Sequence, residues 1–314
     1  MTGGAGFIGS HLAEALARDH EVVVLDSLLT GRRENIEGLD VEVVEGSILD
    51  EDVLAKAVTG AAVVFHEAAI PRVPRSVEFP VESHEANATG TMAVLEAARA
   101  AGVARVVYAS SSSVYGDQPE LPKHEGLAVA PRSPYAASKL AGEAYCRAYT
   151  ASYGLPTVSL RYFNVYGPRQ DPASKYGAAP PNFASRLLAG ERPLVYGDGE
   201  QTRDFTFVTD VVAANVAAWQ AEADKVAGRV FNVGAGNRHS ILRLIEILQE
   251  LAGRTDLEPE FTDPRIGDVR DTLASIDALK QATGWTPTTS LEDGCQALVD
   301  WLKASPDRIV AFAK

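Results

Sequence analysis

Short apolar runs alternate with stretches of helical periodicity along most of this chain. Runs rich in β-branched and aromatic residues predict strands at Glu21–Asp26, Val41–Glu45, Ala61–His66, Ala104–Ala109, Thr157–Arg161 and Val230–Gly234. Apolar residues at helical spacing predict helices at Phe7–Arg18, Asp50–Val58, His84–Ala101 and Ser133–Tyr153. Strands that alternate with helices in this way form a parallel sheet with helices on both faces. We therefore expect an α/β fold with a doubly wound parallel sheet.

Prolines mark two interruptions in this alternation. Pro71, Pro74 and Pro80 predict a loop between the strand at 61–66 and the helix at 84–101. Further along, prolines recur at Pro168, Pro172, Pro180, Pro181 and Pro193. Residues 166–200 are therefore expected to be rich in loops, which suggests that the chain leaves the sheet to build a second, smaller lobe.

The pattern divides the chain into two domains. The first comprises residues 1–165 and is rejoined by roughly 207–234, which includes the last predicted strand. The second, a smaller C-terminal α/β lobe, comprises residues 166–206 and 235–314. Its helices are expected at Ser240–Ala252, which is amphipathic, and at Ser290–Phe312.

Composition places the chain among ordinary globular proteins. It has 314 residues, of which 46% are hydrophobic and 23% charged, enough to bury a large core. The formal net charge of -13 disfavours nucleic-acid binding, although basic residues can still line a pocket. No apolar run approaches membrane-spanning length, and we expect no secretory leader. Cys146 and Cys295 show neither disulfide nor metal-ligand spacing, so we expect buried thiols, a cytoplasmic location and no metal.

A glycine-rich segment opens the chain with the pattern GxxGxxG, formed by Gly3, Gly6 and Gly9. Glycines let the backbone approach a pyrophosphate, which then binds the amide groups at a helix N-terminus. The next predicted strand ends in Asp26, where a carboxylate would hydrogen-bond a ribose hydroxyl and repel a 2′-phosphate. The pattern predicts a dinucleotide site that prefers NAD to NADP. Two alternatives stay open, since Asp26 could only cap a turn and Arg32 and Arg33 leave some room for a phosphate.

Only Met1 and Thr2 precede the first glycine, whereas a dinucleotide-binding fold needs a buried strand there. That strand normally lies centrally in the sheet, and its loss would leave two neighbouring strands with unpaired edges. We therefore hypothesise that about five or six apolar residues, the usual length of a strand, lie upstream of Met1.

The segment from Ser110 to Lys139 carries the candidate chemistry. Its serines follow the predicted strand at 104–109, and Tyr135 and Lys139 stand one helical turn apart. An ammonium beside a phenol stabilises the phenolate and brings the phenol pKa down from about 10 toward neutral pH. A nearby serine hydroxyl could share the proton. The segment would then take a proton from an alcohol, unless the pair arises by chance and the serines merely end a strand.

Spaced motifs in a fixed order resemble those of the extended short-chain dehydrogenase/reductases. They are TGGAGFIGSHL from Thr2 to Leu12, SSSSVYG from Ser110 to Gly116, YAASK from Tyr135 to Lys139, LRYFNVYGPRQDP from Leu160 to Pro172, and GEQTRDFTFVTD from Gly199 to Asp210. Within that family the chain is most similar to the UDP-galactose 4-epimerases, including those that act on N-acetylated UDP-sugars. The resemblance covers nearly the whole chain and implies a Rossmann fold, bound NAD and a homodimer paired through helices at 83–101 and 133–153.

The resemblance also implies catalytic roles. Tyr135 would be the general base and acid, Lys139 would bind the nicotinamide ribose and lower the tyrosine pKa, and Ser111 would relay the proton, with Ser112 as a close second. Such enzymes move a hydride from sugar C4 to NAD while the tyrosinate takes the C4 hydroxyl proton. The 4-keto sugar then turns over and receives the hydride on its other face, so no net redox occurs and NAD stays bound.

Further NAD contacts follow from matching positions. Besides Tyr135 and Lys139, they are Gly3, Gly6, Phe7, Ile8, Gly9, Asp26, Ile48, Ala68, Ala69, Asn87 and Phe163. Two positions depart from the family pattern. Ser47 stands where these families usually place an aspartate near the adenine, and Pro71 replaces a polar residue of some epimerases.

For the diphosphate of a sugar nucleotide, the resemblance implies contacts from Asn164, Arg203 and Arg265. Arginine suits this task because its donor fork matches phosphate oxygens. An alternative is that the two arginines only pair with nearby carboxylates, namely Asp204, Asp263 or Asp268.

The remaining substrate contacts implied by the resemblance are Ser111 and Thr272 at the sugar, Tyr196 against the uracil and Asp268 at a ribose hydroxyl. At the position of Thr272, a bulky side chain in the epimerases excludes an N-acetyl group. Because threonine is small, we expect the chain to accept UDP-GlcNAc and UDP-GalNAc as well as UDP-glucose and UDP-galactose.

Other nucleotide-sugar enzymes share the first half-reaction. A 4,6-dehydratase needs an Asp-Glu pair where this chain has Ser112 and Ser113, and neither serine is a useful acid near neutral pH. A decarboxylase or a uronic acid epimerase stays open, because carboxylate recognition can rest on one or two residues. A non-catalytic NAD-binding protein is compatible with the fold, but it would not need Ser111, Tyr135 and Lys139 together.

Overall fold

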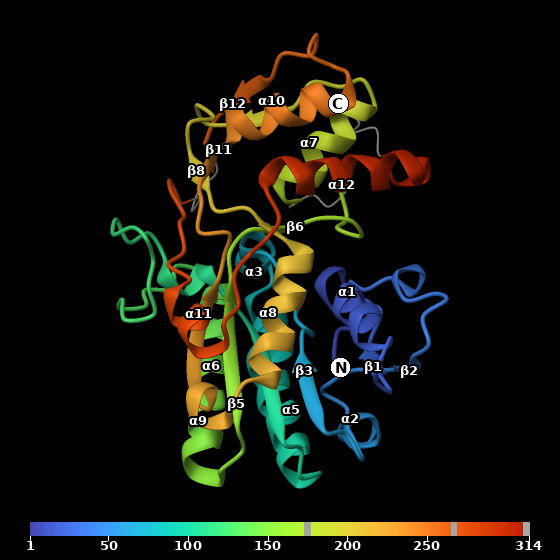
Figure 1. Cartoon of the computed structure of the whole chain (residues 1–314), viewed down its shortest axis with the longest axis vertical. Coiled ribbons are helices and arrows are strands. Elements are labelled where there is room, and N and C mark those ends of the chain that lie inside the picture. Colours follow the sequence, from blue (N-terminus) through green and yellow to red (C-terminus); the bar gives the residue numbers. More distant parts are fainter. Residues whose placement is uncertain (173–176, 265–268, 310–314) are drawn as a thin grey trace.

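A parallel sheet forms the centre of the larger lobe, in the lower half of Figure 1. The computed structural model describes residues 1–172, 177–264 and 269–309. Four strands lie in the order β10-β5-β4-β3, and β1 pairs with β2 beside them, all in parallel. The bounds are β1 (Val23–Asp26), β2 (Glu42–Glu45), β3 (Val63–His66), β4 (Arg105–Ser111), β5 (Thr157–Tyr162) and β10 (Arg229–Val233). Thr2 bridges Leu25 of β1 and His66 of β3, and so joins the two groups of strands.

Helices cover both faces of this sheet, as the sequence predicted. One face is covered by α2 (Glu51–Val58), α5 (Gly90–Ala100) and α6 (Pro134–Tyr153). The other is covered by α1 (Phe7–Leu16), α8 (Val208–Gln220), α9 (Ala223–Val226) and α11 (Asp277–Thr283). Alternate strand residues serve opposite faces, since Val106 packs with the first group and Val107 with the second. The doubly wound α/β fold is therefore confirmed.

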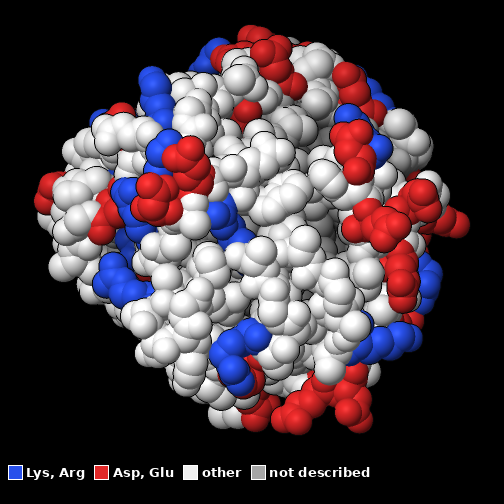
Figure 2. Space-filling view, turned by 60° about the horizontal axis from the view of Figure 1, so that its bottom comes forward, with Lys and Arg blue, Asp and Glu red and all other residues white. Residues whose placement is uncertain are grey.

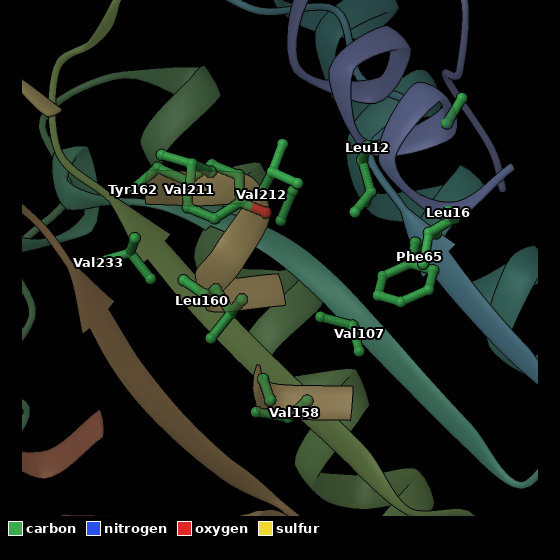
Figure 3. Packing of buried hydrophobic residues seen from close by; sticks show 14 of the residues in the cluster. Leu12, Leu16, Phe65, Val107, Val158, Leu160, Tyr162, Val211, Val212 and Val233 are labelled. Atoms are coloured by element: carbon green, nitrogen blue, oxygen red, sulfur yellow. The ribbon is translucent and has the colours of Figure 1, made fainter. Parts of the chain in front are cut away.

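The second of these faces is packed with interlocking apolar side chains. Figure 3 shows Leu12 and Leu16 of α1 near Phe65 of β3, with Val107 of β4 beside them. Leu12 and Val107 are fully buried. Burying a leucine or valine completely contributes about 1.5–3 kcal/mol, so this core holds α1, and with it the glycine-rich segment, firmly against the sheet.

Residues 73–84 are helical, and the predicted loop is wrong here. α3 (Val73–Glu78) and α4 (Pro80–His84) lead into a π-helical turn, η2 (Glu85–Thr89). Pro74 and Pro80 stand in the first two positions of their helices, where an amide would have no partner inside the helix. Proline begins helices as well as ending them, and the sequence pattern alone did not distinguish the two cases.

The smaller lobe has its own core of three helices, at the top of Figure 1. They are α7 (Ala179–Leu188), α10 (Ile241–Ala252) and α12 (Leu291–Ala304). Short strands and turns connect them: β6 (Val165–Tyr166), β7 (Leu194–Tyr196), β8 (Thr202–Arg203), β9 (Thr206–Phe207), β11 (His239–Ser240), β12 (Glu260–Thr262) and η4 (Pro306–Arg308). In α7 too, a proline stands in the first turn. The amphipathic helix predicted at 240–252 is α10, which buries Leu244 and Leu248.

α11 belongs to the core of the larger lobe, although the sequence analysis assigns residues 235–314 to the smaller one. Leu279 and Trp285 are buried there, and the Trp285 indole Nε1 donates to the Asp210 carbonyl of α8 at 3.1 Å. A helix of seven residues is too short for its apolar spacing to reveal which core it joins.

Charged side chains of both signs are interspersed on the face that Figure 2 shows. On the face in Figure 2, most of them lie toward the rim, around a broad area without charge. Among residues 1–172, 177–264 and 269–309, no helix combines the length and the apolar character needed to span a bilayer.

Candidate active site

A cavity of about 930 Å³ opens at the carboxyl ends of the sheet strands, where parallel α/β folds bind ligands. We call it the larger cavity. Its walls include Asp26 at the end of β1, Ser27 and Leu29–Arg32 after it, Glu67–Arg75 after β3, and Ala109 and Ser110 at the end of β4. Most of the predicted NAD contacts line it: Gly3, Gly6, Phe7, Ile8, Gly9, Asp26, Ile48, Ala68, Ala69, Tyr135 and Lys139.

The glycine-rich segment lies so close to other backbone that side chains would not fit. A Cβ on Gly3 (φ +73°) would lie 2.5 Å from the Ala68 nitrogen, and one on Gly9 would lie 2.1 Å from the Gly3 oxygen. α1 begins at Phe7, and its N-cap, Gly6, provides no side-chain cap. The first amides of α1 therefore stay available to an anion, and this cradle fits the pyrophosphate of a dinucleotide.

Asp26 joins the glycine-rich segment to the turn after β1. Its Oδ2 accepts a hydrogen bond from the Ala5 amide at 2.9 Å, and its Oδ1 accepts one from the Leu28 amide at 2.8 Å. The carboxylate thus caps a turn, as one alternative proposed, and also faces the larger cavity. Nearby, Arg33 pairs with Glu45 at 2.5 Å and Arg32 with Asp171 at 3.4 Å, so acidic partners occupy both arginines.

Two predicted NAD contacts, Asn87 and Phe163, do not line the larger cavity. The buried Asn87 side chain accepts from the Ile70 amide at 2.8 Å and donates to the Ile70 carbonyl at 3.1 Å, so it holds the cavity wall from behind. Phe163 is fully buried against Val114 and Tyr115. Their direct contact with a cofactor stays a prediction.

Tyr135 and Lys139 lie in the first two turns of α6, beside the end of β4. Ser133 caps this helix by accepting from the Ala136 amide at 3.1 Å. The Lys139 Nζ donates to the Ala109 carbonyl at 2.8 Å and lies 6.0 Å from the centre of the Tyr135 ring. Ser111 ends β4 and hydrogen-bonds Tyr135. The structure therefore brings the three residues together.

Ser112 begins the short turn η3 (Ser112–Tyr115) directly after β4. The Ser111 Oγ accepts a hydrogen bond from the Ser113 Oγ at 2.9 Å. The serine run thus positions Ser111 from within the same turn.

Burial raises the pKa of Tyr135, the hydrogen bond to Ser111 lowers it, and the charge of Glu67 raises it. The hydrogen bond to Ser111 is outweighed by burial, and the lowering by Lys139 that the sequence analysis expected stays a prediction. Burial also lowers the pKa of Lys139 to about 8, while Glu67 raises it.

Glu67 is a residue that the sequence analysis missed. It directly follows β3 and lines the larger cavity. Its Oε1 accepts a hydrogen bond from the Tyr162 hydroxyl at 2.7 Å, and the Tyr162 hydroxyl accepts one from the Asn215 Nδ2 at 2.8 Å. Burial raises the pKa of Glu67 to about 7, against lowering by Tyr162 and Lys139. A charged residue directly after a buried apolar strand is the signal that could have revealed it.

A second cavity of about 210 Å³, the smaller cavity, is lined by Asn164, Tyr196 and Arg203, all predicted substrate contacts. It shares Val165 and Ala178 with the larger cavity. The Arg203 Nη1 donates to the carbonyl of Arg270 at 3.0 Å.

The Asp204 carboxylate accepts from three backbone amides, those of Ala235, Gly236 and Ala274. It therefore ties together three segments of the smaller lobe. The carboxylate oxygens of Asp204 thus accept hydrogen bonds from backbone amides. The alternative in the sequence analysis was that Asp204 pairs with an arginine.

Thr272 stands beside Asn164. Its Oγ1 accepts from the Asn164 Nδ2 at 2.9 Å and from the Asp204 amide at 3.1 Å. Arg265 and Asp268, also predicted to bind substrate, lie outside the described residues.

Strained backbone gathers around both cavities. Arg72 (φ 93°), Asn164 (φ 31°) and Arg169 (φ 65°) adopt positive φ without being glycine, and all three line a cavity. Such strain persists where surrounding structure enforces it, which is common at functional sites. The Arg169 Nη2 donates to the Glu14 Oε2 at 2.5 Å. Arg72 and Arg169 were not among the sequence-predicted contacts, because a positive φ at a residue other than glycine cannot be recognised from the sequence.

Comparison with known proteins agrees with this geometry. Residues 1–234 match the NAD dependent epimerase/dehydratase family. A UDP-glucose 4-epimerase of Mycolicibacterium smegmatis is 41% identical over 310 residues, which cover 96% of this chain and 97% of that protein.

Two solved structures are similar over almost their whole length. The UDP-glucose 4-epimerase of Thermotoga maritima with UDP-glucose has a TM-score of 0.93 at 35% identity, covering 97% of this chain and 98% of that one. The UDP-N-acetylglucosamine 4-epimerase of Methanobrevibacter ruminantium, in complex with UDP-N-acetylmuramic acid, has a TM-score of 0.91 at 37% identity, covering 97% of both chains.

Proposed function

The chain belongs to the NAD dependent epimerase/dehydratase family, within the extended short-chain dehydrogenase/reductases, and we propose that it is an isomerase that inverts C4 of a UDP-hexose. The observation that carries this proposal is the pair Tyr135 and Lys139, which lines a cavity shaped for a dinucleotide, with Ser111 hydrogen-bonded to Tyr135. UDP-glucose and UDP-galactose are the proposed pair, with UDP-GlcNAc and UDP-GalNAc as a second. The reaction would pass through a 4-keto sugar.

The larger cavity would hold NAD. The backbone around Gly3 and Gly9 and the first amides of α1 would bind the pyrophosphate, and Asp26 would accept from a ribose hydroxyl. When bound, NAD accepts a hydride from the sugar and later returns it to the same carbon.

Tyr135 would take the proton of the C4 hydroxyl and return it to the same oxygen. The hydrogen bond from Ser111 favours the phenolate that this step needs. The Lys139 ammonium is fixed by the Ala109 carbonyl beside the ring and adds positive charge where the phenolate forms. No proton is gained or lost over the cycle.

The smaller cavity would hold the UDP moiety, with Arg203 and Asn164 at the diphosphate and Tyr196 against the base. Because the two cavities adjoin at Val165 and Ala178, a ligand in the smaller one can extend its sugar toward Tyr135. Arg265 and Asp268 remain proposed contacts. This division assigns NAD to the larger lobe and the sugar nucleotide to the smaller.

Tolerance of an N-acetyl group is proposed on the small side chain of Thr272, beside Asn164. The likeness to an N-acetylglucosamine 4-epimerase supports this part of the proposal. Buried free thiols at Cys146 and Cys295 support action in the reducing cytoplasm.

A homodimer is proposed through the helices at 83–101 and 133–153. Large apolar side chains stand exposed on and near them, with 41% of Met92, 60% of Tyr153 and 69% of Val81 accessible. Light scattering coupled to gel filtration should give twice the mass of one chain. A monomer at micromolar concentration would refute the pairing.

The test of function is product analysis by NMR after the purified protein is incubated, without added NAD, with UDP-glucose and separately with UDP-GlcNAc. The C4 epimers should appear in both reactions. UDP-glucuronic acid serves as the discriminating third substrate. Loss of carbon dioxide, or epimerisation of this sugar alone, would replace the proposal with a decarboxylase or a uronic acid epimerase.

A further inference from the structure

Glu67 lines the same cavity as the catalytic pair but has no part in the chemistry proposed so far. Its carboxyl lines the larger cavity together with Tyr135, Lys139 and Tyr162. The Tyr162 hydroxyl donates a hydrogen bond to the Glu67 Oε1 at 2.7 Å. The Asn215 Nδ2 of α8 donates both to that hydroxyl and, at 2.9 Å, to the Val211 carbonyl. The carboxyl is therefore fixed in place from behind.

A second buried carboxylate nearby shows what is unusual about Glu67. Glu143 forms a two-pronged pair with Arg161, with contacts of 2.8 and 2.7 Å, and both side chains are almost fully buried. Glu67 forms no ion pair with any described residue. A cation in direct contact neutralises Glu143, whereas the charge of Glu67 acts on the groups that face it across the cavity.

We propose that Glu67 is a positioning residue that sets the pH range in which Tyr135, beside the Lys139 ammonium, exchanges a proton with the substrate. This role rests on the proposed function. A negative charge at this place favours the ammonium form of Lys139 and opposes the phenolate form of Tyr135.

The titratable groups that face Glu67 come from three elements. α6 contributes Tyr135 and Lys139, and β5 contributes Tyr162. On β3 itself, burial lowers the pKa of His66 to about 3, so that ring stays neutral. From α8, Asn215 adds a hydrogen bond but no charge.

The pKa directions agree with the geometry. The charge of Glu67 raises the pKa of Lys139 and also that of Tyr135. Because burial brings the pKa of Glu67 to about 7, this carboxyl changes its charge within the neutral range. Its ionisation then keeps Lys139 protonated as the pH rises.

The variant Glu67→Gln tests this role, because it removes the charge and keeps both the shape and an acceptor for Tyr162. Without the charge, the pKa values of Tyr135 and Lys139 both fall. Activity rises with pH as the phenolate forms and is lost as the ammonium loses its proton. Both limbs of the pH profile of kcat/KM should therefore move to lower pH, by about one pH unit.

Glu51→Gln is the control, since Glu51 is exposed at the start of α2 and lines neither cavity. This variant also removes one negative charge, but from a side chain that is not beside Tyr135 and Lys139. Its two limbs should stay where those of the wild-type protein lie. If they shift as far as those of Glu67→Gln, or if the Glu67→Gln profile superimposes on the wild-type profile, the proposed role is wrong.

A second readout separates this inference from the proposed function. The pH titration of tyrosinate absorbance in the NAD-loaded protein, taken as the difference from Tyr135→Phe, reports the ionisation of Tyr135 without any turnover. Glu67→Gln should lower that midpoint, and an unchanged midpoint would overturn the role of Glu67. An inactive wild-type protein would refute the epimerase proposal while this titration still decides the role of Glu67.

Discussion

The larger and the smaller cavity are built from different parts of the chain. The larger one includes a glycine-rich wall, where Gly3 and Gly9 pack so closely that a Cβ would meet backbone atoms. The smaller one is lined by residues that lie far apart in the sequence, such as Asn164 before β6, Tyr196 in β7 and Arg203 in β8. A site made of backbone leaves a compact glycine pattern in the sequence, whereas a site made of distant side chains leaves single residues without a local pattern.

The contrast implies that the two ligands can be uncoupled by substitution. Of the described lining residues, only Val165 and Ala178 belong to both cavities. Changes elsewhere in one cavity should leave binding in the other intact, and catalysis should fail when either is damaged.

The largest expected effect is on chemistry alone. Tyr135→Phe should lower kcat by about 10³-fold, because proton transfer by a positioned group contributes about 10²–10⁴-fold. NAD content and UDP affinity should both stay at wild-type values. Tyr145→Phe, on the same helix with 38% of the side chain exposed, is the control and should remain fully active. Substantial residual activity of Tyr135→Phe would place the base elsewhere.

The second largest effect is expected from a substitution in the glycine-rich segment, and it should fall on NAD affinity. In Gly9→Ala the new Cβ would lie 2.1 Å from the Gly3 oxygen, so the cradle must shift. Loss of about two phosphate hydrogen bonds predicts NAD binding weaker by about 100-fold. UDP affinity, measured by calorimetry on the same preparation, should be unchanged. A parallel loss of UDP affinity would show that the two cavities are not independent.

In the smaller cavity, Arg203→Met should weaken UDP binding by about 10-fold to 100-fold, the effect of losing a charge-assisted hydrogen bond. NAD content should not change. Arg192→Met is the matched control, because this arginine of the same lobe is exposed and donates to the carbonyls of Glu258 and Pro259. Equal effects of the two substitutions would argue that Arg203 only supports the fold.

Thr272→Tyr should have the smallest effect. The larger side chain would fill space beside Asn164 and lower turnover of UDP-GlcNAc relative to UDP-glucose by about 10-fold, the scale of a steric change in a pocket. Competition between the two sugars in one reaction measures this ratio directly. Equal and negligible turnover of UDP-GlcNAc by the variant and the wild-type protein would count against the proposed tolerance.

The same contrast explains what the sequence could predict. The order of strands and helices, Asp26 at the end of β1, and Tyr135 beside Lys139 follow from local periodicity and spacing. The helices at 73–84 were missed because Pro74 and Pro80 occupy helix starts, where proline is tolerated. The local sequence pattern does not show whether a proline begins a helix or interrupts one.

The electrostatics of the site were harder to predict. The effect of burial on Tyr135 and the contact between Glu67 and Tyr162 both depend on tertiary structure. Glu67 and Tyr162 are 95 positions apart, and no spacing rule connects them. A prediction from the sequence therefore finds the groups that react more readily than the groups that tune them.

Only Val165 and Ala178, among the described lining residues, belong to both cavities, and this limited overlap has a consequence for how such proteins diversify. After gene duplication, one copy could accumulate substitutions across 179–205 and acquire a new sugar nucleotide while the residues that line only the larger cavity stay unchanged. Laboratory evolution of new specificities could accordingly restrict its libraries to residues that line only one of the two cavities.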